Sequence, residues 1–178
     1  LKELENEDYY SHAAYGMIGS MNQRREPAEV VEFIGAQDPS IHTHLLRGVF
    51  DSFRSRYKDL DRRVKFAESI NDPNLAHTAH LEIARVSMKE TPIDAANWAL
   101  SLENPKTRDE ILSSSVHPWI DKNMDAAGVW IADTEPSPAL DNTYSHYAQR
   151  AAVIDPASAV SWAESITDLT LRSNTISS

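Results

Sequence analysis

The sequence predicts an all-α fold, and within that class an α-solenoid of about five helical hairpins with a 32-residue period. Three observations support this prediction. Trp98, Trp130 and Trp162 are separated by 32 and 32 residues. Helix-start signals recur at fixed distances around each of them. Glycine is scarce, with 5 residues, whereas 9 prolines are present, the reverse of what turn-rich β proteins need.

One large aromatic residue marks the same place in each repeat: Phe33, Phe66, Trp98, Trp130 and Trp162. Six residues before each of them stand Pro27, Leu60, Pro92, Met124 and Pro156, and the residues before those are Glu26, Asp59, Thr91, Asn123 and Asp155. Asp, Asn and Thr cap free backbone N–H groups at a helix start, and proline there loses no hydrogen bond. Short helices are therefore expected over 28–37, 60–70, 92–102, 125–134 and 156–166.

The spacing of the apolar residues indicates which face of each short helix is buried. Positions −3, 0, +1 and +4 relative to the aromatic residue share one helical face. Small residues dominate beside the tryptophans, with Ala95, Ala127 and Ala159 at −3. We interpret the aromatic column as packing between hairpins rather than as a stripe for stacking sugars or bases.

A second start signal follows each aromatic residue: Asp38-Pro39, Asp72-Pro73, Asn104-Pro105, Ser137-Pro138 and Asp168-Leu169. Each precedes a longer segment with apolar residues at helical spacing, so long helices are expected over 39–58, 73–89, 105–123, 138–153 and 169–176. A first helix is expected over 8–23. Because His117-Pro118 falls inside the fourth long helix, a kink or an early break is expected there.

Stacked hairpins bury a continuous core that no single hairpin could form. We therefore expect one α-helical repeat domain over 1–178, with units at about 8–37, 39–70, 73–102, 105–134 and 138–166 and a partial unit at 169–178. The chain starts at Leu1, and its last residues resemble the opening of another helix. We expect it to be a piece of a longer protein.

The best-formed unit, residues 155–166, has the form D-P-x-x-A-x-x-W-A-x-x-I. This pattern resembles the tetratricopeptide-like, tandem helical-hairpin repeats of large uncharacterised bacterial proteins. The resemblance covers residues 26 to 178 and is strongest from 91 onward. It implies protein–protein interaction or scaffolding and carries over no catalytic residue.

Composition limits the classes of partner. The formal net charge is −10, which argues against a nucleic-acid surface because phosphate binding needs clustered Lys and Arg. No apolar run is long enough to insert in a membrane. The absence of cysteine excludes disulfides and thiolate sites. The compartment stays open between cytoplasm and export, and no cofactor is expected.

One local basic cluster contrasts with the acidic chain. Arg54, Arg56, Arg62 and Arg63 lie within ten residues, across an expected turn between helices. They are the candidate partner-binding residues, for an anionic partner. The alternative interpretation is a solvated turn whose long side chains lie over apolar surface.

Two histidine pairs are the candidate metal ligands. His77 and His80 would share one face of a helix, and His42 and His44 lie at a similar place one unit earlier. Zinc needs at least a third ligand, and the spacing is not that of a zincin motif.

No nucleophile elbow, P-loop or dinucleotide fingerprint is present. We therefore expect a non-enzymatic interaction or scaffolding module that binds a protein or peptide. The alternative is a structural spacer within a larger envelope or secreted protein, and a weaker alternative is a metal-dependent enzyme that uses His77 and His80.

Overall fold

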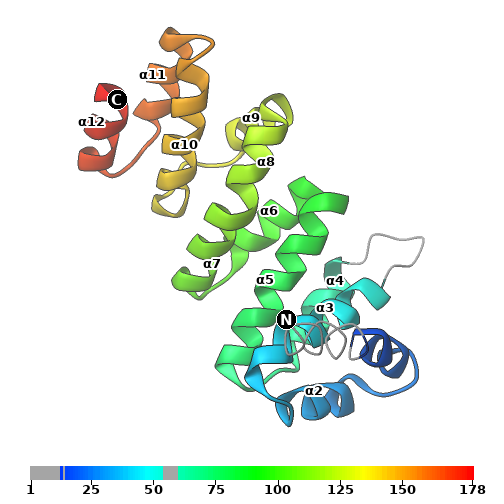
Figure 1. The fold of residues 1–178 in the computed structure, drawn as a ribbon. Coiled ribbons are helices and arrows are strands. Elements are labelled where there is room, and N and C mark those ends of the chain that lie inside the picture. The colour runs from blue at the N-terminus through cyan, green and yellow to red at the C-terminus, as the bar shows by residue number, and fades with distance from the viewer. Residues whose placement is uncertain (1–12, 14, 54–59) are drawn as a thin grey trace, which may run out of the picture. The chain divides into compact units, whose positions relative to one another are not determined.

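A computed structural model of the chain describes residues 13, 15–53 and 60–178. Every regular element among these residues is helical, and none of them forms a strand. This confirms the all-α fold class. The helices are joined by short connections (Figure 1). The chain divides into two compact units, Leu1–Glu90 and Thr91–Ser178, each described by itself below.

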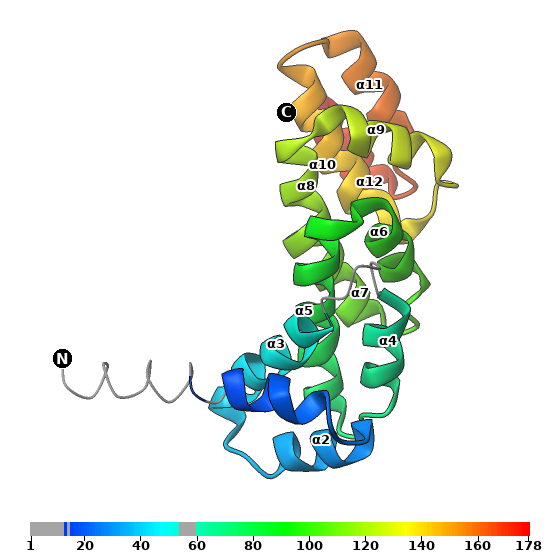
Figure 2. The ribbon, with the colours of Figure 1, turned by 90° about the vertical axis from the view of Figure 1, so that its right-hand side faces the viewer.

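Unit 1 is built around the long helix α5 (Pro73–Glu90), against which α3 (His42–Ser52) and α4 (Leu60–Glu68) pack (Figure 2). The other described elements are the helical residues 15–22, α2 (Pro27–Gly35) and the 3₁₀ turn η1 (Pro39–Ile41). The core contains Phe50 and Phe66, whose rings meet edge to face with centroids 5.7 Å apart. Edge-to-face pairs of this kind add to the free energy of burial.

Unit 2 contains the remaining elements. They are α6 (Pro92–Ser101), α7 (Pro105–Ile111), the π-helical segment η2 (Leu112–Val116), α8 (His117–Lys122), α9 (Met124–Asp133), the 3₁₀ turn η3 (Pro138–Leu140), α10 (Asp141–Ala152), α11 (Pro156–Glu164) and α12 (Leu169–Ser177). Consecutive helices pack on each other, as in the pairs α8–α9, α10–α11 and α11–α12.

The starts of the helices agree with the sequence signals to within one residue. The short helices begin at Pro27, Leu60, Pro92, Met124 and Pro156, and the long segments begin at Pro39, Pro73, Pro105, Pro138 and Leu169. Several expected caps are made: the Asp155 side chain accepts from the backbone N–H groups of Ala157 and Ser158, and the Asp168 side chain accepts from that of Leu171. The Thr91 side chain makes no capping hydrogen bond, so α6 begins at Pro92 without a side-chain cap.

Of the kink or early break expected at His117-Pro118, the break is not observed. Residues 105–122 are helical without interruption, and a π-helical turn, Leu112–Val116, stands just before the proline. Proline has no N–H to donate to the carbonyl four residues earlier, and its ring crowds that carbonyl. The wider π turn accommodates both effects and keeps the helix continuous.

The aromatic column is buried to different degrees. Phe66 and Trp130 are only 2% and 3% exposed, whereas Phe33, Trp98 and Trp162 are half-buried. Trp130 packs on Trp119, and its indole N–H donates to the side-chain oxygen of Asn97. The small residues three places before the tryptophans, Ala95, Ala127 and Ala159, are all buried.

Candidate functional site

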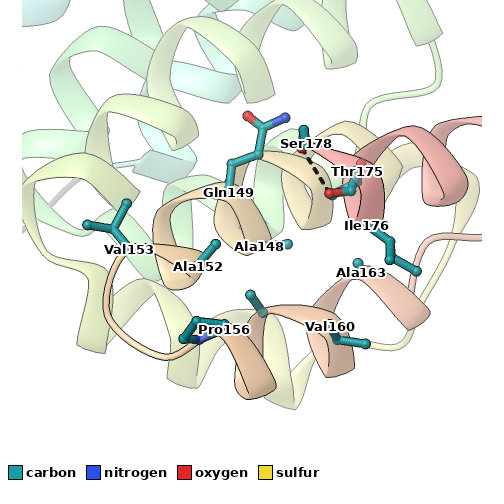
Figure 3. A pocket seen from close by; sticks show the side chains of 11 residues that line it. Ala148, Gln149, Ala152, Val153, Pro156, Val160, Ala163, Thr175, Ile176 and Ser178 are labelled. Carbon is teal, nitrogen blue, oxygen red and sulfur yellow. Dashed lines mark hydrogen bonds between the residues drawn. The ribbon is translucent and has the colours of Figure 1, made fainter.

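An apolar hollow lies between α10, α11 and α12 in unit 2 (Figure 3). Its volume is about 480 Å³, and we call it the α11 groove. It is lined by Ala148, Gln149, Ala152, Val153, Pro156, Ala159, Val160, Ala163, Thr175, Ile176 and Ser178. None of these lining residues is charged, so the α11 groove suits an uncharged, apolar occupant.

The groove has a floor of small side chains and a rim of larger ones. Ala148 and Ala163 are 3% and 1% exposed, whereas Val160 and Ile176 are 42% and 47% exposed. Figure 3 shows Pro156 and Val160 of α11 facing Ala148 and Ala152 of α10 across the hollow. Solvent therefore reaches apolar side chains that stand around an alanine floor.

The helical register of α11 produces this arrangement. Pro156, Ala159, Val160 and Ala163 are spaced as i, i+3, i+4 and i+7, and such residues form one face of a helix. Trp162 points elsewhere, because its ring packs on Tyr144 and Tyr147 of α10 with centroids 6.4 and 4.8 Å away. The aromatic residues thus hold α10 and α11 together and leave the small residues to line the groove.

The turn between α10 and α11 extends the apolar surface. Val153 and Ile154 are 86% and 77% exposed, and Val153 also lines the groove. One period earlier, the corresponding residues are Asp121 and Lys122. Exposed large apolar side chains that gather at one place mark a contact surface more often than single scattered ones do.

A second hollow in unit 2, of about 560 Å³, is polar and contains two histidines. The rings of His117 (α8) and His146 (α10) stack with centroids 4.4 Å apart. His146 Nε2 lies 2.9 Å from Asp121 Oδ1, to which Arg150 Nε donates at 2.7 Å. The hydrogen bond from Arg150 is the main reason that the pKa of Asp121 is lowered, and His146 adds to it.

Burial is the main cause that lowers the pKa of His117 to about 4, and the positive charge of His146 lowers it further. His117 Nε2 is buried with no hydrogen-bond partner among the described residues. Two face-to-face imidazoles direct their ring-nitrogen lone pairs along parallel planes, so in this arrangement they do not converge on one metal ion. The stacked rings form a contact between α8 and α10.

The predicted metal candidates lie on unit 1. His77 and His80 are on α5, half-buried, and burial followed by the charge of His77 lowers the pKa of His80. His42 Nε2 is 3.1 Å from the backbone oxygen of Gln37. The described residues contain no group of three or more His, Asp or Glu placed to hold a metal.

The predicted basic cluster is divided. Arg54 and Arg56 lie outside the described residues. Arg62 is exposed, with its guanidinium carbon 4.7 Å from the centre of the Phe53 ring.

Arg63 is a correction to the predicted surface cluster, because it is only 1% exposed. It pairs with Glu90 at 2.9 Å and donates to Ser87 Oγ at 3.1 Å. Arg63 stands three residues before Phe66, at the place that Ala95 and the other column alanines take in later repeats. The repeat alignment could therefore have placed it inside.

Sequence reasoning missed the α11 groove as a site. Two signals could have indicated it. The turn residues Val153 and Ile154 are apolar where the preceding unit has charges, and Val160 stands where the preceding unit has Gly128.

Comparison with protein-family models, curated proteins and solved structures finds no match for this chain. Its function is therefore inferred from its own residues. Among the described helices, none has the length and apolar composition required to span a membrane.

Proposed function

We propose that the chain is a non-enzymatic protein–protein interaction or scaffolding module, built of helical hairpins that repeat every 32 residues. Within unit 2, the starts of α6, α9 and α11 at Pro92, Met124 and Pro156 support the repeat. They are separated by 32 and 32 residues. The π-helical turn before Pro118 lies inside one unit and does not change this spacing.

The burial pattern supports the same repeat. The residues three before and one after each tryptophan are buried in all three short helices of unit 2: Ala95, Ala99, Ala127, Ile131, Ala159 and Ala163. Equivalent positions with equivalent burial are what stacked hairpins require, because each hairpin covers the same face of the one before it. Two helices per unit with short links are the elements of an α-solenoid.

The single observation that carries the interaction proposal is the α11 groove. The groove has an alanine floor, three exposed aliphatic side chains at its rim and no charged side chain in its lining. An apolar side chain of a partner protein would be buried there away from solvent, which is favourable. Burial of apolar surface is the dominant favourable contribution to most protein–protein association.

The experiment is affinity capture with the full chain as bait, followed by reconstitution. The chain is immobilised and exposed to extract from its own source, and retained proteins are purified and mixed with the chain in solution. The proposal expects at least one of them to co-elute with it at fixed stoichiometry in size-exclusion chromatography. Repeated capture with no protein that re-forms a complex would contradict an interaction role and would favour a structural spacer.

A further inference from the structure

The polar hollow of unit 2 contains two buried polar atoms that lack a partner. It lies between η3–α10 and the continuous helix of residues 105–122, has a volume of about 560 Å³, and is called the histidine hollow after His117 and His146, which both line it. Thr143 of α10 also lines it and is 1% exposed. Thr143 Oγ1 and His117 Nε2 are buried and make no hydrogen bond to any described residue. The large majority of buried side-chain polar atoms in proteins have a partner, so two exceptions in one hollow favour a ligand with hydrogen-bonding groups.

The charged groups that line the histidine hollow are acidic. Asp109 and Glu110 line it, and none of the described lining residues is Lys or Arg. The Asp109 carboxylate is 56% exposed and lies 3.5 Å from Nε of Arg108, which is not part of the lining. Burial, followed by the charge of His146, holds the pKa of His117 at about 4, so the His117 ring is neutral near pH 7. The electrostatic potential in the hollow therefore favours a cation.

Part of the lining is apolar, which favours an organic cation over a metal ion. Pro138 and Ala139 of η3 both line the hollow, and Pro138 is exposed. The methylene groups of an aliphatic cation lose contact with water against such side chains, whereas a metal ion gains nothing from them. The described residues also contain no group of three or more His, Asp or Glu that could hold a metal ion.

From these observations we propose that the histidine hollow binds a primary aliphatic ammonium group, carried by a free amine or by a lysine side chain. The inference goes beyond the proposed interaction function, because it concerns a second site that shares no lining residue with the α11 groove except Gln149. An ammonium group has three N–H donors. The carboxylates of Asp109 and Glu110 offset its charge, and the two unpartnered atoms of the hollow accept from it.

The two acceptors differ in how they become available. His117 Nε2 accepts in the tautomer that carries its proton on Nδ1. Thr143 Oγ1 is buried, so the ligand reaches it after a rotation about χ1. Threonine in a helix populates two χ1 rotamers, and the rotation breaks no hydrogen bond because this hydroxyl has no partner among the described residues.

The experiment uses the full chain and follows the Cε1–H NMR signals of His117 and His146 at a pH of about 7.5. His117→Gln and His146→Gln assign the two signals among the 7 histidines of the chain. The probe is n-butylammonium, and two matched compounds share its butyl chain: 1-butanol has no charge, and butyltrimethylammonium has the charge but no N–H. The peptide acetyl-Ala-Lys-Ala-amide presents the ammonium group on a lysine side chain. Ionic strength is held constant, because salt screens exposed carboxylates.

The expected result is a saturable shift of both signals by n-butylammonium. The butanol and trimethyl compounds should bind at least about tenfold more weakly, because each lacks the charge or the donors. The peptide should shift the same two signals, and the ratio of its dissociation constant to that of n-butylammonium shows whether a lysine side chain or a free amine fits better. The inference is overturned if neither ammonium compound gives a saturable shift, or if butyltrimethylammonium binds as tightly as n-butylammonium.

Two double variants test the carboxylates. Asp109→Asn with Glu110→Gln should weaken n-butylammonium binding about tenfold, the sum of two partly screened charge interactions. Asp133→Asn with Glu164→Gln is the matched control, because it removes the same charge from two exposed residues that do not line the hollow. The control should leave the dissociation constant within about twofold of the native value. Equal effects of the two double variants would overturn the inference.

Thr143→Val separates a binding role from a structural one. The change removes the unpartnered hydroxyl and keeps the shape of the side chain, so the free energy of unfolding should stay the same or rise, while n-butylammonium binding weakens about threefold or more. Lower stability with unchanged binding would overturn the inference. The proposed interaction function is tested separately, because Val160→Glu in the α11 groove leaves n-butylammonium binding unaltered: Val160 does not line the histidine hollow.

Discussion

The imidazole rings of His117 and His146 lie face to face, with centroids 4.4 Å apart and planes within 4° of parallel. The stack connects α8 to α10, and Asp121 Oδ1 lies 2.9 Å from His146 Nε2 and accepts a hydrogen bond from Arg150 Nε. Two protonated rings at this separation would repel each other, because the shared environment is partly desolvated. The arrangement therefore favours a neutral His117.

Lowering the pH is expected to weaken unit 2 through His117. Its pKa is about 4 in the folded protein and near the ordinary value of 6.5 in the unfolded chain. Between these two values the unfolded chain binds more protons, so the free energy of unfolding falls as the pH is lowered from about 6.5 to about 4. The contribution of His117 to this fall is about 1–2 kcal/mol after a discount for solvent screening.

Urea unfolding of the native chain and of His117→Gln, each at about pH 7 and about pH 4.5, measures this contribution. The other carboxylates and histidines titrate in both proteins, so the difference between the two pH responses isolates His117. We expect the glutamine variant to lose less stability on acidification. Identical responses would show that the stacked pair is not the acid-sensitive element.

Gly128→Ala tests the contact between α9 and α10. Alanine favours a helix over glycine by about 1 kcal/mol, but the added Cβ would overlap the hydroxyl end of Tyr147, which is 7% exposed and has little room to move. We expect a net loss of about 1–3 kcal/mol in the free energy of unfolding. In the Tyr147→Leu background the same change should become neutral or stabilising, and a double-mutant cycle measures the coupling. Additive effects would mean that the two residues do not touch.

Trp130→Ala tests the aromatic column. Trp130 is 3% exposed and packs on Trp119, so its removal should lower the free energy of unfolding by about 3–5 kcal/mol. Asn97→Ala, which leaves the indole N–H without its acceptor, should cost about 1–2 kcal/mol. Denaturant unfolding of both variants checks the order of the two effects. A near-zero effect of Trp130→Ala would mean that this residue faces solvent.

Arg62 and Arg63 are neighbours in sequence with opposite environments. Arg63→Ala removes a buried guanidinium and leaves Glu90 without its partner, at an expected cost of about 3–5 kcal/mol. Arg62→Ala removes an exposed cation from the face of Phe53, and about 0.5–1 kcal/mol is expected. Thermal unfolding of the two variants gives the comparison. Equal effects would restore the interpretation of both residues as surface side chains.

Much of the local structure could be predicted from the sequence, because helix starts depend on short-range chemistry. Asp155 followed by Pro156 specifies a cap and a first turn wherever the segment lies, and the structure begins α11 at that proline. The continuous helix through Pro118 could not be predicted in the same way. Whether a proline ends a helix or is accommodated by a π turn depends on the packing of residues such as Leu112 and Val116, both of which are buried.

The candidate site was harder to predict, because it is a space between α10, α11 and α12 that the small side chains around it leave empty. Ala148 and Ala163 are buried, yet the hollow above them appears only when the positions of α10, α11 and α12 are known. The basic cluster shows the opposite error. Because it is charged, Arg63 was predicted to lie on the surface. It stands three residues before Phe66, however, and the repeat alignment shows that this is a buried position.

The most direct test of the central claim, that the α11 groove binds a partner protein, is the affinity of a reconstituted partner for three forms of the chain. Isothermal titration calorimetry with the native, Val160→Glu and Val129→Glu chains gives the three dissociation constants. We expect Val160→Glu to weaken binding about tenfold or more. Val129→Glu is the control, because Val129 of α9 is 61% exposed and lies outside the groove, and it should leave the dissociation constant within about twofold of the native value. Equal dissociation constants for all three chains would contradict it.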